Sequence, residues 1–196
     1  MRVVIIKYNA GNIFSVNYGL KRISVDAEIT GDIEKIKNAD KVIFPGVGEA
    51  STTMAYLREH RLDNVIKELK QPVFGICIGM QLLCSYSEEG NTECLGIFDE
   101  KVMKFSPQEP NIKVPHMGWN TIQHNGNKLF KGISNDEYVY YVHSYYAGVG
   151  ENTIATTDYV HPFSASLQKD NFYAVQFHPE KSGAIGEKIL RNFIEL

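Results

Sequence analysis

Short apolar segments alternate with amphipathic ones through the first half of the chain, and this alternation predicts strands and helices in turn. The expected strands lie at residues 3–6, 25–29, 41–44 and 73–76. The expected helices lie after residue 77 and at residues 12–22 (with Asn12 as the cap), 31–37, 49–59 and 62–69. Because short, fully apolar strands between helices have to be covered on both faces, this half predicts a parallel sheet flanked by helices.

After about residue 87 the pattern changes to strands joined by turn residues. These strands are expected at residues 102–105, 118–122, 138–142, 153–157, 163–167 and 173–177, and a helix at 183–194 closes the chain. Asn125-Gly126 predicts a hairpin turn. No low-complexity tract, repeat or linker divides the sequence. We therefore expect one α/β domain over residues 1–196, with a central, mostly parallel sheet flanked by helices and a more antiparallel C-terminal portion.

The charge balance excludes several classes of partner. The net charge is −3, and the charges are mixed along the chain without a basic stripe or a basic amphipathic helix. This pattern argues against nucleic acid and against a membrane surface as partners. No apolar run is long enough to span a bilayer. Residues 1–7 are too short an apolar segment for a signal peptide, so we interpret them as the first strand.

Three cysteines, Cys77, Cys84 and Cys94, indicate the redox compartment. Their odd number and the lack of a framework spacing argue against a disulfide scaffold. No C-x-x-C pair and no histidine at zinc-finger spacing accompanies them. We therefore expect a protein of the reducing cytoplasm, with neither a metal nor a cofactor. Cys84 follows Cys77 by one heptad on the expected helix and is predicted to be a core residue.

Cys77 stands between an apolar strand and an apolar helix, with Gly75 two residues before it and Gly79 two residues after it. This is the strand–nucleophile–helix elbow, with cysteine where hydrolases carry serine. The turn is so tight that Cβ atoms at the two glycines would collide with neighbouring backbone. At the start of the helix the unpaired N–H groups favour a thiolate, and the Ile78 N–H is a candidate oxyanion donor. The alternative is that Cys77 is an ordinary buried cysteine. This alternative gives no reason for the two flanking glycines.

A cysteine nucleophile needs a base with an orienting partner, and the sequence offers His178-Pro179-Glu180. In an extended backbone the side chains of His178 and Glu180 share a face, and Pro179 favours that extended state. The carboxylate then reaches one imidazole nitrogen while the other nitrogen faces the thiol. The preceding strand delivers this pair to the carboxyl end of a sheet, where open α/β sheets hold their sites. A solvent-facing histidine is the alternative.

One further histidine and one glycine-rich turn are candidates for the same centre. His143 is the main rival for the base, but we interpret it as a core or pocket-lining histidine because no carboxylate stands two residues away. The turn Pro45-Gly46-Val47-Gly48 allows three interpretations. We rank first a second oxyanion N–H, as a neighbouring loop supplies in hydrolases with an elbow, and a plain strand-to-helix turn second. The third, a phosphate cradle, lacks the remaining glycine of the dinucleotide fingerprint and the lysine of the P-loop.

These motifs together carry a family resemblance. Residues 75–83 (Gly-Ile-Cys-Ile-Gly-Met-Gln-Leu-Leu) with His178-Pro179-Glu180 resemble the class I, triad-type glutamine amidotransferases. Residues 114–120 (Val-Pro-His-Met-Gly-Trp-Asn), 141–145 (Tyr-Val-His-Ser-Tyr) and 45–48 are similar to the glutaminase subunit of imidazole glycerol phosphate synthase. The similarity covers essentially the whole chain. The elbow is specific to the superfamily, and the Pro-His-Met-Gly-Trp-Asn run is specific to this subunit.

The resemblance implies a role for each site residue. Cys77 attacks the side-chain amide carbon of glutamine, and His178, held by Glu180, protonates the departing ammonia and then activates water against the thioester. Backbone N–H groups hold the oxyanion, at Val47, Gly48 and Ile78. The residues implied to bind glutamine are Gly46, Gln81, Glu89, Ser144 and Tyr145. A carboxylate such as Glu89 is a sensible partner for the α-ammonium group of glutamine.

The resemblance also implies a protein partner, a (βα)8-barrel cyclase that receives the ammonia and forms imidazole glycerol phosphate in histidine biosynthesis. Keeping ammonia from water requires a sealed joint. The implied interface residues are Asn12, Met117, Trp119 and Lys181, and plain core packing is the alternative for Trp119. Relatives usually carry an acidic residue at Lys7, which leaves the detail of the partner-facing surface open.

Three alternatives to this function remain. A paralogous glutaminase would feed another aminating partner. A stand-alone cysteine hydrolase, such as a peptidase or a gamma-glutamyl hydrolase, would use the same triad without a partner. A non-catalytic binding domain would hold a phosphate at the turn 46–48, but the reaction centre in this sequence is complete, which disfavours it.

Overall fold

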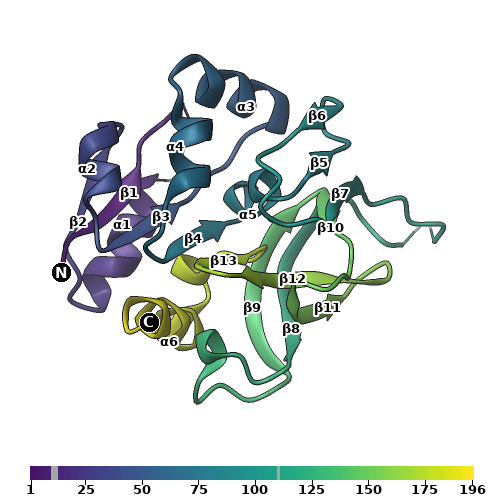
Figure 1. Ribbon diagram of the computed structural model, residues 1–196. Helices are drawn as coiled ribbons and strands as arrows, with labels where there is room; N and C mark the ends of the chain where they lie inside the picture. The colour runs from purple at the N-terminus through teal and green to yellow at the C-terminus, as the bar shows by residue number, and fades with distance from the viewer. Residues whose placement is uncertain (10–12, 110) are drawn as a thin grey trace.

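Five parallel strands form the first half of a large sheet in the computed structural model, which describes residues 1–9, 13–109 and 111–196 (Figure 1). The strands are β1 (Val3–Ile6), β2 (Ala27–Thr30), β3 (Lys41–Phe44), β4 (Val73–Ile76) and β13 (Phe172–Val175). β1 pairs with β2 and β3, and β4 pairs with β3 and β13, all in parallel. The residues of β1, β3 and β4 are buried throughout, which explains their continuous apolar character.

Antiparallel strands complete the sheet. They are β8 (His116–His124), β9 (Glu137–His143), β11 (Thr153–Asp158) and β12 (Pro162–Lys169). Among the described residues the sheet has nine strands in the order β2-β1-β3-β4-β13-β12-β11-β8-β9. The expected α/β class with a parallel first part and an antiparallel later part is therefore confirmed, as a large mixed sheet flanked by helices.

Helices cover both faces of the parallel half. One core contains residues of α2 (Ile33–Lys37), α3 (Ala50–Glu59), α4 (Leu62–Glu68) and α5 (Ile78–Leu83). The other contains residues of α1 (Ile13–Arg22) and α6 (Gly183–Ile194). Alternate residues of β1 enter the two cores, Val4 and Ile6 the first, Val3 and Ile5 the second. The sheet is thus fixed from both sides, and its strand ends are held in place.

A smaller sheet lies beside the carboxyl end of the parallel strands (Figure 1). Its order is β10-β7-β5-β6, where β5 is Tyr86–Ser87, β6 is Thr92–Glu93, β7 is Lys101–Lys104 and β10 is Tyr145–Ala147. Only β7 was expected from the sequence. Strands of two or three residues show no measurable periodicity, so β5, β6 and β10 gave no signal.

The hairpin predicted at Asn125-Gly126 is present, but its connection is longer than a two-residue turn. β8 and β9 do pair antiparallel, from His116 opposite His143 to Ile122 opposite Glu137, but a 3-10 helix η1 (Lys128–Phe130) lies in their connection. The side chain of Asn127 accepts from the Leu129 N–H, and the side chains of residues 129 and 130 are buried. Burial of these two apolar residues requires a connection longer than a two-residue turn.

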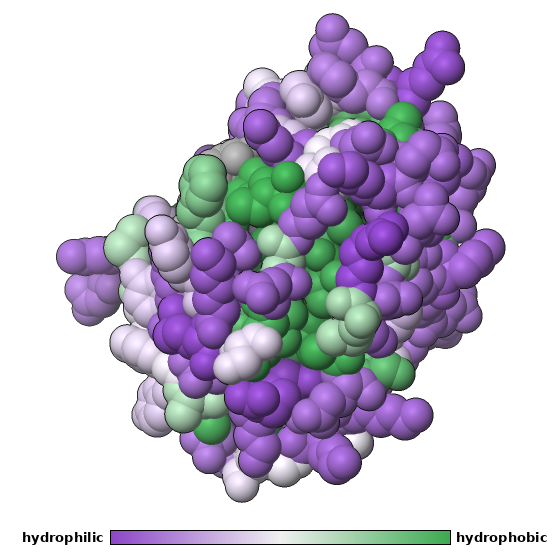
Figure 2. Space-filling view, turned by 90° about the vertical axis from the view of Figure 1, so that its left-hand side faces the viewer, coloured by the Kyte–Doolittle hydropathy of each residue, from purple (hydrophilic) through white to green (hydrophobic). Residues whose placement is uncertain are grey.

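The face formed by α1, α2 and the edge strand β2 carries apolar residues at its middle, inside a hydrophilic border (Figure 2). Apart from its exposed Glu28, β2 is half-buried, as its edge position predicts.

Among the helices of the described ranges, none combines the length and the apolar character needed to cross a membrane. The predicted cap Asn12 lies outside the described residues.

Candidate active site

Three loops of the candidate site leave the carboxyl ends of three neighbouring parallel strands. β3 leads into the turn 45–48, β4 leads into Cys77, and β13 leads into the segment 176–180. Because β4 pairs in parallel with both β3 and β13, these three loops emerge side by side at one edge of the sheet. The order of strands, rather than the order of the sequence, thus brings the candidate groups together.

The elbow has the strained geometry that its sequence predicts. Cys77 adopts φ 55° and ψ −111°, a conformation that residues with side chains rarely adopt. A Cβ atom on Gly79 would lie 1.9 Å from the Phe44 carbonyl oxygen, and one on Gly75 would lie 2.8 Å from Leu83 Cδ1. The N–H groups of the first turn of α5 fold back on the Cys77 carbonyl, with the Met80 N–H at 3.0 Å. Close packing of β3, β4 and α5 therefore holds the cysteine in this turn.

The Cys77 sulfur lies among groups that can bind it in either protonation state. The Val142 carbonyl oxygen is 4.0 Å away and accepts from the thiol, and the Gln176 side-chain amide donates to the sulfur at 3.8 Å. The other two cysteines are different. Burial raises the pKa of Cys94 to about 11 and the pKa of Cys84 well above its usual value. Both are therefore poor nucleophiles, and Cys84 is a core residue as predicted.

His178 and Glu180 form a buried pair beside this sulfur. Nδ1 of His178 lies 2.9 Å from Oε1 of Glu180, and both side chains are almost fully buried. Burial lowers the pKa of His178, but the Cys77 sulfur and then the Glu180 carboxylate outweigh it and raise this pKa to about 10. Among the described residues, Nε2 of His178 has no hydrogen-bond partner in standard geometry. The Cys77 sulfur nevertheless raises the pKa of His178, first through its charge and second as a hydrogen-bond partner.

The backbone of this pair differs from the expected extended form. His178 itself is extended, with φ −100° and ψ 95°, but residues 179–181 form the 3-10 helix η2 (Pro179–Lys181). Glu180 therefore reaches the ring around a helical turn instead of along one face of a strand. The Tyr140 carbonyl accepts from the His178 N–H at 2.9 Å, and Arg22 donates to the Glu180 carbonyl at 2.7 Å. These bonds tie the turn to β9 and to α1, which replaces the rigidity that a strand would give.

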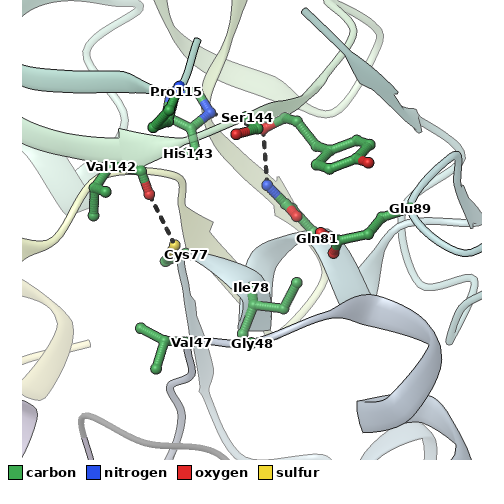
Figure 3. Close-up of a pocket in the computed structure, with 11 residues that line it drawn as sticks. Val47, Gly48, Cys77, Ile78, Gln81, Glu89, Pro115, Val142, His143 and Ser144 are labelled. Atoms are coloured by element: carbon green, nitrogen blue, oxygen red, sulfur yellow. Dashed lines mark hydrogen bonds between the residues drawn. The ribbon is translucent and has the colours of Figure 1, made fainter.

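A cavity of about 320 Å³ opens over the Cys77 sulfur (Figure 3). Its wall brings together the predicted oxyanion residues and most of the predicted glutamine-binding residues. The lining residues are Val47, Gly48, Cys77, Ile78, Gln81, Glu89, Pro115, Val142, His143, Ser144 and Tyr145. No group of three or more His, Cys, Asp and Glu side chains in the described ranges is arranged to hold a metal ion.

Gln81 and Glu89 present oxygen atoms for a ligand. The Gln81 side-chain amide donates to the Tyr145 carbonyl at 2.9 Å and to the Gln176 side chain at 2.8 Å. Since both hydrogens are used, Gln81 can offer a ligand only its acceptor oxygen. One oxygen of Glu89 accepts from the Ala50 N–H at 2.8 Å, at the start of α3. Burial raises the pKa of Glu89, so this half-buried carboxylate has lost part of its hydration, and a cation is a suitable ligand for it.

His143 is a neutral member of the cavity wall. Its Nδ1 donates to the Tyr145 carbonyl at 2.7 Å, so its Nε2 accepts from Nδ1 of His116 at 3.0 Å. Burial lowers the pKa of His143 to about 3 and that of His116 to about 4. Asn120 extends this row of hydrogen bonds by donating to the other nitrogen of His116 at 3.3 Å. A ring with such a low pKa and both nitrogens occupied is a poor base, as the preferred interpretation of His143 predicts.

Some predicted residues lie elsewhere. Gly46 is not part of the cavity wall and lies against the Tyr8 hydroxyl. Met117 and Trp119 are 63% and 55% exposed, which rules out core packing as the reason for Trp119. Lys181 is exposed beside Tyr140, and Asn12 lies outside the described residues.

Sequence reasoning missed four residues around the site, namely Tyr8, Pro115, Val142 and Gln176. Of these four residues, Gln176 has the clearest signal in the sequence. It is a polar residue at the end of an otherwise apolar strand, two positions before His178, and a buried polar side chain needs a hydrogen-bond partner. Val142 acts through its backbone carbonyl, for which a sequence carries no signal.

Comparison with known proteins agrees with this geometry. The family model for glutamine amidotransferase class-I matches residues 7–196. The chain belongs to the class-I glutamine amidotransferase family.

Solved structures with a similar fold lead to the same fold class. A putative GMP synthase component from Thermoplasma acidophilum matches with a TM-score of 0.73 at 20% identity, covering 100% of this chain and 93% of that one. A glutamine amidotransferase crystal structure matches with a TM-score of 0.76 at 18% identity, covering 100% and 98%.

Curated relatives narrow the comparison within the family. The chain is 64% identical over 196 residues to the imidazole glycerol phosphate synthase subunit HisH of Bacteroides fragilis, and 62% identical to that of Bacteroides thetaiotaomicron, with 100% of each chain covered. It is 46% identical over 198 residues to HisH of Escherichia coli K12, again with 100% of each chain covered. The full-length similarity therefore points to HisH subunits in particular.

Proposed function

We propose that this chain is the glutaminase subunit of an imidazole glycerol phosphate synthase and that it hydrolyses glutamine to glutamate and ammonia. The observation that carries the proposal is the buried pair His178–Glu180, 2.9 Å apart, acting on the sulfur of a cysteine in a strained elbow. Full-length identity to HisH subunits supports the same conclusion. The pathway is histidine biosynthesis, and the compartment is the cytoplasm.

In the first half-reaction the thiolate of Cys77 attacks the side-chain amide carbon of glutamine, and a carbon–sulfur bond forms. The negative charge that develops on the carbonyl oxygen is held by the N–H of Ile78 and by N–H groups of the turn at Val47 and Gly48. The imidazolium of His178 gives its proton to the departing nitrogen as the carbon–nitrogen bond breaks. Ammonia leaves, and a thioester on Cys77 remains.

In the second half-reaction His178 is neutral and takes a proton from water. The water oxygen attacks the thioester carbon, the carbon–sulfur bond breaks, and glutamate leaves. The thiolate of Cys77 and the imidazolium of His178 are thereby restored. Glu180 stabilises the ring whenever it is protonated, which agrees with its contribution to the raised pKa of His178.

The cavity wall supplies the contacts for the amino-acid end of glutamine. Glu89 is the proposed partner of the α-ammonium group, because it is a partly desolvated carboxylate at the wall. The acceptor oxygen of Gln81 suits an N–H donor of the substrate, and Ser144 and Tyr145 form the wall beside it. Gly46 acts indirectly in this proposal, since it lies behind the wall.

The proposed partner is a barrel-type cyclase that docks on the outer face of β8 and β9. Met117, Trp119 and Tyr138 are exposed there, at 63%, 55% and 59%. The Trp119 ring packs edge-on against Tyr140 at 5.8 Å, and Nζ of Lys181 lies 5.9 Å from the same ring. Tyr140 also accepts from the His178 N–H. Tyr140 thus contacts both the proposed interface and the proposed base. This short path suits the transfer of ammonia without release into water.

The test is ammonia release from glutamine by the purified chain, with and without the cyclase subunit. We expect slow release alone, strong stimulation by the cyclase, and loss of release in Cys77→Ser. Full turnover without any partner would contradict the subunit role and favour a stand-alone cysteine hydrolase. Stimulation only by another aminating barrel would favour a paralogue.

A further inference from the structure

Tyr8 lies at the back of the turn that follows β3. It lies two residues after the end of β1 and is 5% exposed. Its hydroxyl donates to the Pro45 carbonyl at 2.5 Å, and its ring packs against Phe44, with 5.5 Å between the ring centroids. Burial raises the pKa of Tyr8 far above its usual value, and the charge on Cys77 adds to this effect. The hydroxyl therefore keeps its proton and remains a hydrogen-bond donor throughout the working pH range.

The same hydroxyl lies close to Gly46, the next residue of the turn. A Cβ atom on Gly46 would lie 1.9 Å from the Tyr8 hydroxyl and 2.5 Å from Cγ2 of Ile78. The Pro45–Gly46 peptide is therefore held between a hydrogen bond on its carbonyl side and the side chain that follows the nucleophile. Val47 and Gly48, which come next, form part of the cavity wall. Gly48 has φ 132°, so the chain turns sharply there.

We propose that Tyr8 is a positioning residue for the oxyanion loop, defined as residues 45–48. By binding the Pro45 carbonyl, the hydroxyl fixes the plane of one peptide and so the directions of the N–H groups that follow it. Without the hydroxyl that carbonyl has lost its donor, and the peptide can rotate to find another. Tyr8 does not line the cavity, so it acts through the loop and not on the substrate. This inference rests on the proposed function, since it assigns the loop an oxyanion to bind.

Tyr8→Phe removes the hydroxyl and keeps the ring against Phe44. Loss of one oxyanion donor typically costs about 100-fold to 1,000-fold in kcat, so partial misorientation of the loop predicts a fall of about tenfold or more. We expect KM for glutamine to change by less than about threefold, because Gln81 and Glu89 are untouched. These constants are measured on the complex with the cyclase, which is the form with full activity.

A second readout separates the loop from the nucleophile. Alkylation of Cys77 by chloroacetamide is a displacement at carbon in which chloride leaves, so no oxyanion develops. We expect Tyr8→Phe to be alkylated at the wild-type rate. The matched control is Tyr159→Phe, because the Tyr159 hydroxyl also donates to a backbone carbonyl, that of Lys113, at 2.6 Å. We expect the control to keep both its kcat and its alkylation rate.

The outcomes are distinct. An unchanged kcat in Tyr8→Phe, or equal losses of kcat and alkylation rate, would overturn the positioning role. A variant that fails to fold would also overturn it, because the hydroxyl would then be needed for the fold as a whole. Failure of the proposed function would appear in the wild-type protein instead, as the absence of glutamine hydrolysis with the cyclase present.

Discussion

Single residues in this molecule act through their immediate neighbours, and His178 illustrates this best. Burial alone would lower its pKa, yet the sulfur of Cys77 and the carboxylate of Glu180 raise that pKa to about 10. A ring with this pKa is protonated at neutral pH, so in the proposed mechanism it carries the proton that the leaving nitrogen needs. The charge on the His178 ring therefore depends on the neighbouring Cys77 sulfur.

Cys77→Ala should therefore lower the pKa of His178. The substitution removes the largest cause of the upward shift and leaves burial, which acts downward, against Glu180 alone. The measurement is an NMR titration of the His178 ring in both proteins. Cys84→Ala serves as the control, because that buried thiol is not among the groups that shift His178. A ring pKa that stays near 10 in Cys77→Ala would show that Glu180 suffices.

The sequence predicted Cys77, His178 and Glu180 because the reasons for them are local. Glycines two positions to each side mark the elbow, and a proline between the last two residues marks the pair. Tyr8 and Gln176 were not predicted. Their partners, the Pro45 carbonyl and the Cys77 sulfur, are 37 and 99 residues away in the chain. Such contacts depend on strand order, which residue spacing does not determine.

Among the elements, the turn between β4 and α5 is tightly constrained by packing. Gly79 lies against the Phe44 carbonyl of the neighbouring strand β3, so α5 approaches the sheet more closely than any side chain would allow. The apolar strands and longer helices were predictable from periodicity. The 3-10 helix η2 and the short strands β5, β6 and β10 were not, since they are formed by tertiary contacts and have no period of their own.

Gly79→Ala should destabilise the protein by about 3 kcal/mol or more, because its Cβ would lie 1.9 Å from a backbone oxygen that cannot move freely. The free energy of unfolding is measured by urea titration. Gly148→Ala is the matched control, since its Cβ meets only the end of the Met103 side chain, at 3.4 Å. The control should change stability by less than about 0.5 kcal/mol. Equal stability of the two variants would mean that the elbow is not tightly packed.

At the scale of the whole molecule, the strand order of the large sheet brings the proposed cyclase-binding face close to the proposed reaction centre. β13 lies next to β4 at the centre of the sheet, while β9 forms its far edge and curves back to hold His178. The sequence predicted the α/β class but not this order, because nothing in an isolated strand states its neighbour. The arrangement connects the proposed cyclase-binding face of β8 and β9 to the reaction centre by one hydrogen bond.

Trp119→Ala should weaken binding of the cyclase by about tenfold or more, because exposed tryptophans at interfaces commonly dominate the binding energy. Isothermal titration calorimetry measures the dissociation constant. Val149→Ala is the control, since Val149 is apolar and similarly exposed, at 57%, but lies outside β8 and β9. If both variants bind as the wild type does, the cyclase docks on a different face.

The most direct test of the thioester mechanism is to treat the chain, with the cyclase bound, with an alkylating analogue of glutamine and to map the labelled peptide by mass spectrometry. The account predicts one adduct, on Cys77, that excess glutamine prevents and that Cys84 and Cys94 never carry. A label on another residue, or no label at Cys77 while the complex hydrolyses glutamine, would contradict it.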